Sequence, residues 1–199
     1  MKEYILNCIS LISGKDFRYY FVLYSSIFVI SAIITAIIGL KYTKMPDYAI
    51  YFMKNYTSLR FGDSGFISIL SNNFFIVILM MYFFYSMELD NFKIFLGKFY
   101  FLYMGSVTGL IISKSIIKYN LVMALSLVVP HGIIEISTMI FAISFGWALS
   151  GLKGLQPITP IFITISLAIL ILLTISAYIE AHVTLKIFEE LANRYSITI

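Results

Sequence analysis

The chain has 199 residues, of which 60% are hydrophobic and 12% are charged, and its formal net charge is +4. Soluble domains carry roughly 25% charged residues, so this composition excludes a soluble domain, which would leave much of its apolar surface unburied. The 14 basic residues are spread thinly between hydrophobic runs. This excludes a nucleic-acid-binding face, which needs clustered Lys and Arg. The composition instead predicts a membrane protein in contact with the lipid bilayer.

Five hydrophobic stretches are each long enough to cross a hydrocarbon core, which takes about 20 helical residues. Before them, residues 1–16 are predicted to form an amphipathic lead-in helix with Ile5, Ile9 and Ile12 on one face. The predicted spans cover residues 17–40, 66–87, 91–113, 119–150 and 158–185. We therefore predict an all-α polytopic bundle of about five spans, forming a single integral membrane domain over residues 1–199.

Few charged residues lie inside the predicted spans. The first span has no charge after Arg18, and the second has none. The third carries Lys93 and Lys98 at its entry, where long side chains are expected to reach the interface. Lys and Arg occur on both sides of the spans without a clear excess. Because the first span usually dominates insertion, we place the N-terminus of this multi-pass cell-membrane protein in the cytoplasm.

Short turn-like residues precede the second span in the sequence Gly62–Gly65. Asp63 or Ser64 suits the N-cap of a helix that starts there. The same four residues also resemble the surroundings of the serine nucleophile in some proteases, and an intramembrane protease would need a histidine opposite the serine. We favour the helix start, with Ser64 retained as the nucleophile of an alternative hydrolase.

The fourth and fifth spans each contain one acidic residue, Glu135 and Glu180, in otherwise uncharged segments. The two histidines of the chain, His131 and His182, lie beside them. Such groups are costly to place in lipid without partners. We therefore interpret this region as the functional centre of the protein.

Depth along the spans places the polar residues in one half of the membrane. At a rise of about 1.5 Å per residue, His131 lies roughly 18 Å into its span and Asn72 about 9 Å into its own, from the same side. The fifth span runs in the opposite direction, so Glu180 approaches that side near its end. The predicted intramembrane polar site consists of Asn72, Asn73, His131, Glu135 and Glu180.

Spacing along the helices indicates which side chains share a face. His131 and Glu135 are four residues apart and lie on one face of a helix. Glu180 and His182 are two apart and point in nearly opposite directions, so only one can join the site. We choose Glu180, which lies deeper, and interpret His182 as a boundary residue.

Pro130 and Gly132 flank His131 in the fourth span. Proline removes a backbone hydrogen bond and glycine loosens the chain, so the span is predicted to kink or break near Pro130. Broken helices often mark the ion or substrate site of transporters. A proline kink that serves packing alone is the alternative.

Packing also offers an alternative for some of the polar and small residues. Asn72 and Asn73 could join helices by hydrogen bonds within the membrane. Gly105 and Gly109 form a Gly-x-x-x-Gly face on the third span, suited to close helix contact within the chain or between two copies in a homodimer.

The order of these residues resembles that of the stage II sporulation protein M family of multispanning membrane proteins. The resemblance covers roughly residues 17–190 and rests on Asn72 with Asn73, on the segment 130–135 with sequence Pro-His-Gly-Ile-Ile-Glu, and on the segment 177–181 with sequence Ala-Tyr-Ile-Glu-Ala. It implies a partnership with other membrane or envelope proteins. The namesake works with peptidoglycan-degrading partners during forespore engulfment, a role that we do not transfer because many relatives occur in organisms that never sporulate.

Three functions are consistent with these residues. The favoured one is a non-enzymatic membrane scaffold or accessory protein with an intramembrane site that binds a small cation or a proton. A divalent metal is a candidate ligand, with His131, Glu135 and Glu180 as candidate donors. The alternatives are a small-cation transporter or channel and an intramembrane hydrolase assisted by a metal or by Ser64.

Overall fold

The computed structural model describes residues 2–41, 62–151 and 158–194. Every regular element in these ranges is a helix. The helices are α1 (Lys2–Ser13), α2 (Lys15–Lys41), α4 (Gly62–Ser86), α5 (Asp90–Lys118), α6 (Leu121–Ser150), α7 (Ile158–Tyr178), the π-helix η1 (Ile179–Thr184) and α8 (Leu185–Arg194). The prediction of an all-α bundle is confirmed.

Five helical segments are long and apolar enough to cross a membrane. They are Lys15–Lys41, Gly65–Ser86, Asp90–Lys118, Val128–Ser150 and Thr159–Leu191. These segments correspond one to one with the predicted spans. Their ends differ by several residues because hydropathy alone does not mark where a helix continues into the polar zone.

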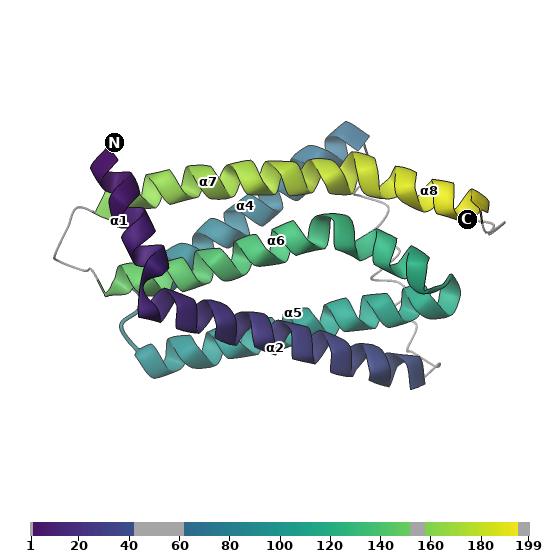
Figure 1. Ribbon diagram of the computed structural model, residues 1–199, viewed down its shortest axis with the longest axis horizontal. Coiled ribbons are helices and arrows are strands. Elements are labelled where there is room, and N and C mark those ends of the chain that lie inside the picture. The colour runs from purple at the N-terminus through teal and green to yellow at the C-terminus, as the bar shows by residue number, and fades with distance from the viewer. Residues whose placement is uncertain (1, 42–61, 152–157, 195–199) are drawn as a thin grey trace.

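The helix α6 lies at the centre of the bundle. Of its spanning window, 67% is buried, against 33% or less for each of the other four. It packs against α2 and α5 on one side and against α4 and α7 on the other (Figure 1). The short helix α1 lies across one end, where it contacts α7, α2 and α6. Polar residues on α6 are therefore the ones best shielded from lipid.

The pair α2 and α5 makes the closest helix contact of the bundle. A Cβ atom at Gly105 would clash with Ser31 and the Phe28 carbonyl of α2, and one at Gly109 would clash with the Ala32 carbonyl. Only glycine allows the two backbones to approach this closely. The predicted glycine face is thus used within the chain, and it offers no argument for a homodimer.

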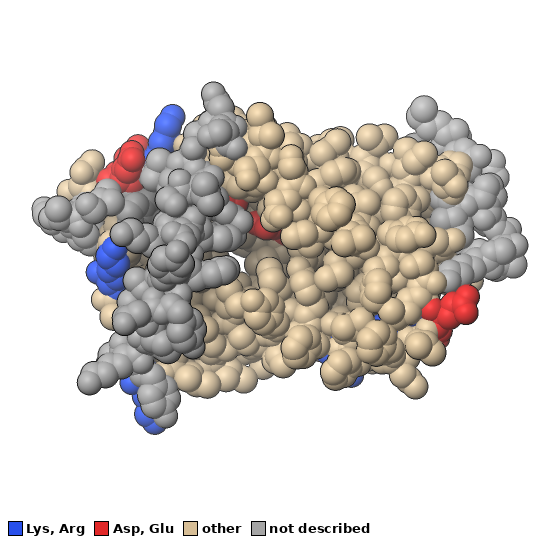
Figure 2. Space-filling view, turned by 180° about the vertical axis from the view of Figure 1, so that it is seen from behind, with Lys and Arg blue, Asp and Glu red and all other residues tan. Residues whose placement is uncertain are grey.

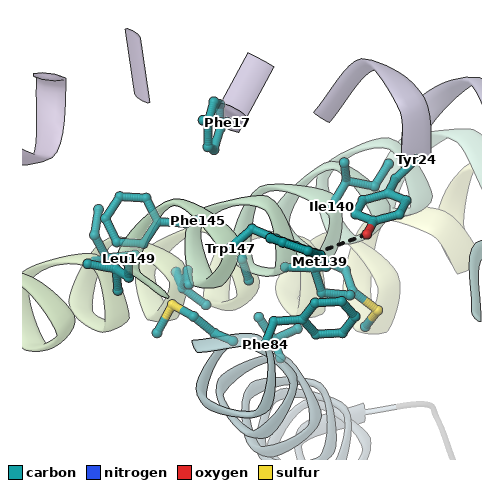
Figure 3. Close-up of a cluster of buried hydrophobic side chains, with 14 of the residues drawn as sticks. Phe17, Tyr24, Phe84, Met139, Ile140, Phe145, Trp147 and Leu149 are labelled. Carbon is teal, nitrogen blue, oxygen red and sulfur yellow. Dashed lines mark hydrogen bonds between the residues drawn. The ribbon is translucent and has the colours of Figure 1, made fainter. Parts of the chain in front are cut away.

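Aromatic and aliphatic side chains fill the centre of the bundle (Figure 3). The only tryptophan of the chain, Trp147 on α6, donates a hydrogen bond from its indole nitrogen to the Tyr24 hydroxyl at 3.2 Å. Tyr20 stacks on Trp147 with ring centroids 4.2 Å apart. These contacts join α2 to α6 and satisfy the indole donor, which would otherwise be costly to bury.

The position of Lys93 corrects one expectation. Its side chain is only 1% exposed rather than extended to the interface. The Nζ atom lies 3.1 Å from the Asp90 carboxylate, 3.4 Å from the Ser150 hydroxyl and 4.4 Å from the ring centre of Trp147. Lys98, by contrast, is exposed. Asp90 of its own helix and two residues of α6 thus provide Lys93 with partners, so burial is tolerated.

Candidate intramembrane cation site

The central helix α6 bends where it carries the first candidate residue. Its start is capped by the Asn120 side chain, which accepts a hydrogen bond from the Met123 amide at 2.9 Å. Pro130 lies inside the helix and cannot donate to the carbonyl four residues earlier. The helix stays continuous from Leu121 to Ser150 and bends in its N-terminal half (Figure 1). It is therefore kinked and not broken.

The fifth span contains an irregularity that the sequence analysis missed. Residues Ile179–Thr184 form a π-helical segment, η1, between α7 and α8. Glu180, Ala181 and Thr184 are its buried residues. Short π-helical segments inside α-helices occur frequently at functional sites, because the widened turn displaces side chains from their regular positions.

Three of the predicted site residues are brought together by α6 and η1. A ring nitrogen of His131 and one carboxylate oxygen each of Glu135 and Glu180 all lie within 4.8 Å of one another. Glu180 is 7% exposed, while His131 and Glu135 are half-buried. We call these three residues the His-Glu cluster.

The two asparagines on α4 behave differently from each other. Asn73 is buried, and its helix packs against both α6 and η1. Asn72 is exposed on the outer surface of α4 and is not among the residues brought together. The difference follows from the 100° rotation between neighbouring helical residues, which allows only one of the pair to face the centre.

The second histidine lies outside the cluster. His182 is half-buried, with its ring centroid 4.9 Å from that of Tyr178 and 6.4 Å from that of Phe66. Its neighbours are aromatic, whereas Glu180 of the same segment joins the cluster. The choice between Glu180 and His182 made from their spacing agrees with this arrangement.

Two hydroxyl groups that the sequence analysis missed hold His131 in place. The Thr184 hydroxyl lies 3.3 Å from Nδ1 of the ring, and the Ser176 hydroxyl donates to the His131 main-chain carbonyl at 3.0 Å. Both side chains are buried. A usable signal was present, because Ser176, Glu180 and Thr184 repeat every four residues near the end of the fifth span.

The comparisons with known proteins identify the family of the chain. The sequence matches the family model of stage II sporulation protein M over residues 22–185. The chain belongs to the stage II sporulation protein M family. No curated protein and no solved structure matches it. Together with the five spanning helices, membership of the stage II sporulation protein M family makes this a multi-pass integral membrane protein in contact with the bilayer.

The His-Glu cluster of this stage II sporulation protein M family member fits a small cation. Donor atoms that share an ion at about 2.0–2.2 Å lie at most about 4.4 Å apart. The observed upper limit of 4.8 Å therefore requires side-chain movements on the order of 1 Å or less to close around an ion. Ionised Glu135 and Glu180 with a neutral imidazole carry two negative charges, which match one divalent cation.

Two cavities differ in their relation to the cluster. A small cavity of about 20 Å³ adjoins Glu135 between α2, α5 and α6, and it has room for about one water molecule. A larger cavity of about 450 Å³ lies at the bundle end that holds the start of α5 and the end of α6. Its lining includes Asp16, Tyr20, Glu88, Asp90, Lys93 and Trp147. Since Trp147 follows Glu135 by 12 residues and His131 by 16 on α6, this cavity lies about 18–24 Å along the helix from the cluster residues of α6.

Exposed large hydrophobic side chains are numerous on the surface of the bundle. Figure 2 shows one broad face in which most charged side chains lie toward the two ends of the long axis, while a single acidic surface is visible in a hollow amid uncharged residues. An acidic group at this depth contrasts with the exposed aliphatic side chains of α2 and α7 on the bundle surface.

Proposed function

We propose that this protein is a membrane scaffold or accessory component for other envelope proteins, and that the His-Glu cluster binds a small cation which holds α6 and η1 together. The convergence of one imidazole and two carboxylates within 4.8 Å carries the proposal. Cation binding fixes the angle between α6 and the fifth span. Because these helices form part of the bundle surface, it also fixes the shape of the surface that partner proteins contact.

Energetics favour a bound cation over packing alone. An acidic residue at the centre of a spanning helix costs about 2.5–3.5 kcal/mol, so Glu135 and Glu180 together cost about 5–7 kcal/mol. Their mutual repulsion adds to this, since like charges a few ångströms apart oppose each other. A cation between the two glutamates offsets both the cost of burial and the repulsion. A pair of apolar residues that served packing alone would incur neither cost.

Transport of the same cation is the second candidate. A proline kink in α6 and a π-helical segment in the fifth span lie at the same depth, and irregular helices in membranes often line cavities or ion paths. The small cavity beside Glu135 lies toward α2 and α5, and its other lining residues are apolar. The hydrolase alternative ranks third, because it needs an activated nucleophile for which the sequence offers only incomplete parts. The side chain of its candidate nucleophile, Ser64, lies outside the described residues.

Metal analysis of the purified protein tests the proposal. Wild-type protein in detergent is dialysed against divalent cations at low concentration, and the bound metal is counted by mass spectrometry. We expect one ion per chain, with loss of binding in His131→Ala and in the double variant Glu135→Gln, Glu180→Gln. Glu189→Gln is the matched control, because this glutamate is exposed on α8. Equal binding by wild type and double variant, or none by wild type, overturns the proposal.

Proteoliposomes separate scaffold from transporter. Vesicles loaded with a metal-sensitive dye are exposed to the ion found by dialysis. The scaffold predicts a binding site without flux, and the transporter predicts flux that the double variant abolishes. Flux in the wild type that stops in the variant would replace the first candidate by the second.

A further inference from the structure

The outer face of α4 carries a polar side chain to which the bundle provides no partner. Asn72 is exposed and lies seven residues after the start of the spanning segment Gly65–Ser86, about 10 Å into it along the helix axis. Among the described residues, its side-chain amide has no hydrogen-bond partner. An amide that faces lipid loses the hydrogen bonds that water would supply, and this loss is costly. The position of Asn72 therefore favours a contact that the described bundle does not provide.

The other two amides within the described spans are placed differently. Asn73 is buried in the bundle. Asn91 lies in the first turn of α5, at the end of its span, where the polar zone of the membrane is close. Of these three amides, only Asn72 combines exposure with a position inside a span.

Asn72 belongs to a stripe of exposed residues that has the spacing of a helix–helix contact. Steps of four, three, four and three residues join the exposed positions along α4. We call this stripe the α4 seam, and its members are Ser68, Asn72, Phe75, Leu79 and Tyr82. At 100° per residue, the five positions fall within an arc of about 80°. An average spacing of 3.5 residues is that of two helices packed at a shallow, left-handed crossing angle.

The α4 seam points away from the rest of the chain. The helix packs with its opposite side against α6, α7 and η1, and it passes behind α6 and α7 in Figure 1. Phe75, Leu79 and Tyr82 are 67%, 52% and 55% exposed. The seam is thus open to another helix in the membrane.

We propose that the α4 seam binds the α4 seam of a second copy of this chain, and that Asn72 of the two copies exchange hydrogen bonds across a twofold axis along the membrane normal. The inference concerns a surface and a partner that the proposed function leaves open. It does not depend on cation binding by the His-Glu cluster.

The chemistry of asparagine favours a second copy over a different partner. The amide of Asn72 has an oxygen that accepts and a nitrogen that donates, so two such amides that face each other satisfy each other with two hydrogen bonds. Copies inserted in the same orientation have parallel α4 helices, and twofold symmetry then places each seam residue opposite its own counterpart. A single asparagine in such a seam fixes the register, because a shift of one helix along the other leaves both amides unpaired.

The sizes of the seam residues fit this arrangement. Ser68 lies one turn before Asn72, and its small side chain allows the two backbones to come close. The short Asn72 side chains can then reach each other. Phe75, Leu79 and Tyr82 provide apolar contacts along the rest of the seam, and such van der Waals packing drives helix association in lipid.

Energy transfer between purified chains in liposomes tests the proposal. Chains with a donor or an acceptor fluorophore at the C-terminus are mixed at a series of protein-to-lipid ratios, and we expect transfer that rises with the ratio and fits a dimer. Asn72→Leu keeps the size and removes the amide, so its association constant should fall about 5–30-fold. The matched control is Ser26→Leu, which makes a polar-to-apolar change at an exposed position of α2 and should dimerise like wild type.

Disulfide cross-linking in membranes examines the seam residue by residue and needs no variant of Asn72. The single natural cysteine is first removed by Cys8→Ser. In this background, oxidation of Ser68→Cys and of Leu79→Cys should produce cross-linked dimers. Ile67→Cys is the matched control, because Ile67 is 63% exposed but lies about 100° away from Ser68 around the helix.

Three results would overturn the proposal. Wild type that stays monomeric at every protein-to-lipid ratio shows that a second copy does not bind, and it leaves a helix of a different membrane protein as the partner of Asn72. Equal dimerisation of Asn72→Leu and wild type shows that the amide does not join the copies. Cross-linking of Ile67→Cys in place of Ser68→Cys and Leu79→Cys places the contact on another face of α4.

Discussion

Replacement of Glu180 by glutamine should change stability in opposite directions with and without the bound ion. Glu180 is 7% exposed and lies with His131 and Glu135 inside the 4.8 Å limit of the His-Glu cluster. Glutamine keeps the size and removes the charge. Without metal, the variant should unfold at the same temperature as wild type or higher, because an acidic residue at a span centre costs about 2.5–3.5 kcal/mol.

In the presence of metal, wild type should unfold at a higher temperature than Glu180→Gln. An ion at 100 times its Kd stabilises the protein that binds it by about 2.7 kcal/mol. For a chain of 199 residues, each kcal/mol shifts Tm by about 2–4 °C, so wild type should gain about 5–11 °C. Glu180→Gln, with one donor lost, should gain much less, and the two unfolding temperatures should cross as metal is added.

The single tryptophan provides the assay. Trp147 is 8% exposed and lies on α6, the helix that carries two of the three cluster residues. Its fluorescence during heating in detergent reports the loss of the central contacts. Glu189→Gln, exposed on α8, should respond to metal as wild type does. If Glu180→Gln is less stable than wild type by the same amount with and without metal, the cluster serves packing and the reasoning fails.

Three further predictions concern the helices that build the site. Gly109→Val should lower the free energy of unfolding by about 1–3 kcal/mol, because the new side chain meets the α2 backbone. Gly132→Ala is the matched control, since a Cβ atom there makes only ordinary contacts. It should be neutral or stabilising in thermal unfolding. Lys93→Met should leave the free energy of unfolding nearly unchanged, since apolar replacements of buried charges are often neutral. Asp90→Asn should lower it, because the buried lysine charge loses its carboxylate partner. Chemical unfolding of the two variants measures both effects. Pro130→Ala should straighten α6 and weaken cation binding at least tenfold without loss of the folded state, and intact folding with unaltered affinity would show that the kink does not shape the site.

The sequence alone determined the five spans and two of the most informative pairings. Backbone polar groups within lipid must bond inside their own segment, so any apolar run of sufficient length becomes a helix whatever surrounds it. The pairing of His131 with Glu135 follows from a spacing of four on one helix. The choice of Glu180 over His182 as the third site residue follows from their spacing of two, which points them in nearly opposite directions, and from the greater depth of Glu180.

Only the tertiary structure decided how these helices face one another. Asn73 turns inward and Asn72 outward, and the glycines of α5 receive α2 of the same chain. Lys93 is buried because Ser150 and Trp147 approach it from α6. Each of these outcomes depends on contacts between residues far apart in the chain, which hydropathy and spacing do not encode.

The π-helical segment is the clearest case of a feature beyond the sequence pattern. The residues Ser176, Glu180 and Thr184 are visible as a repeat of four, but a regular helix would have turned Thr184 away from Ser176. The widened turn aligns them against His131 at the kink of α6. Hydrogen bonds to a second helix stabilise this arrangement, and those bonds exist only once the bundle has assembled.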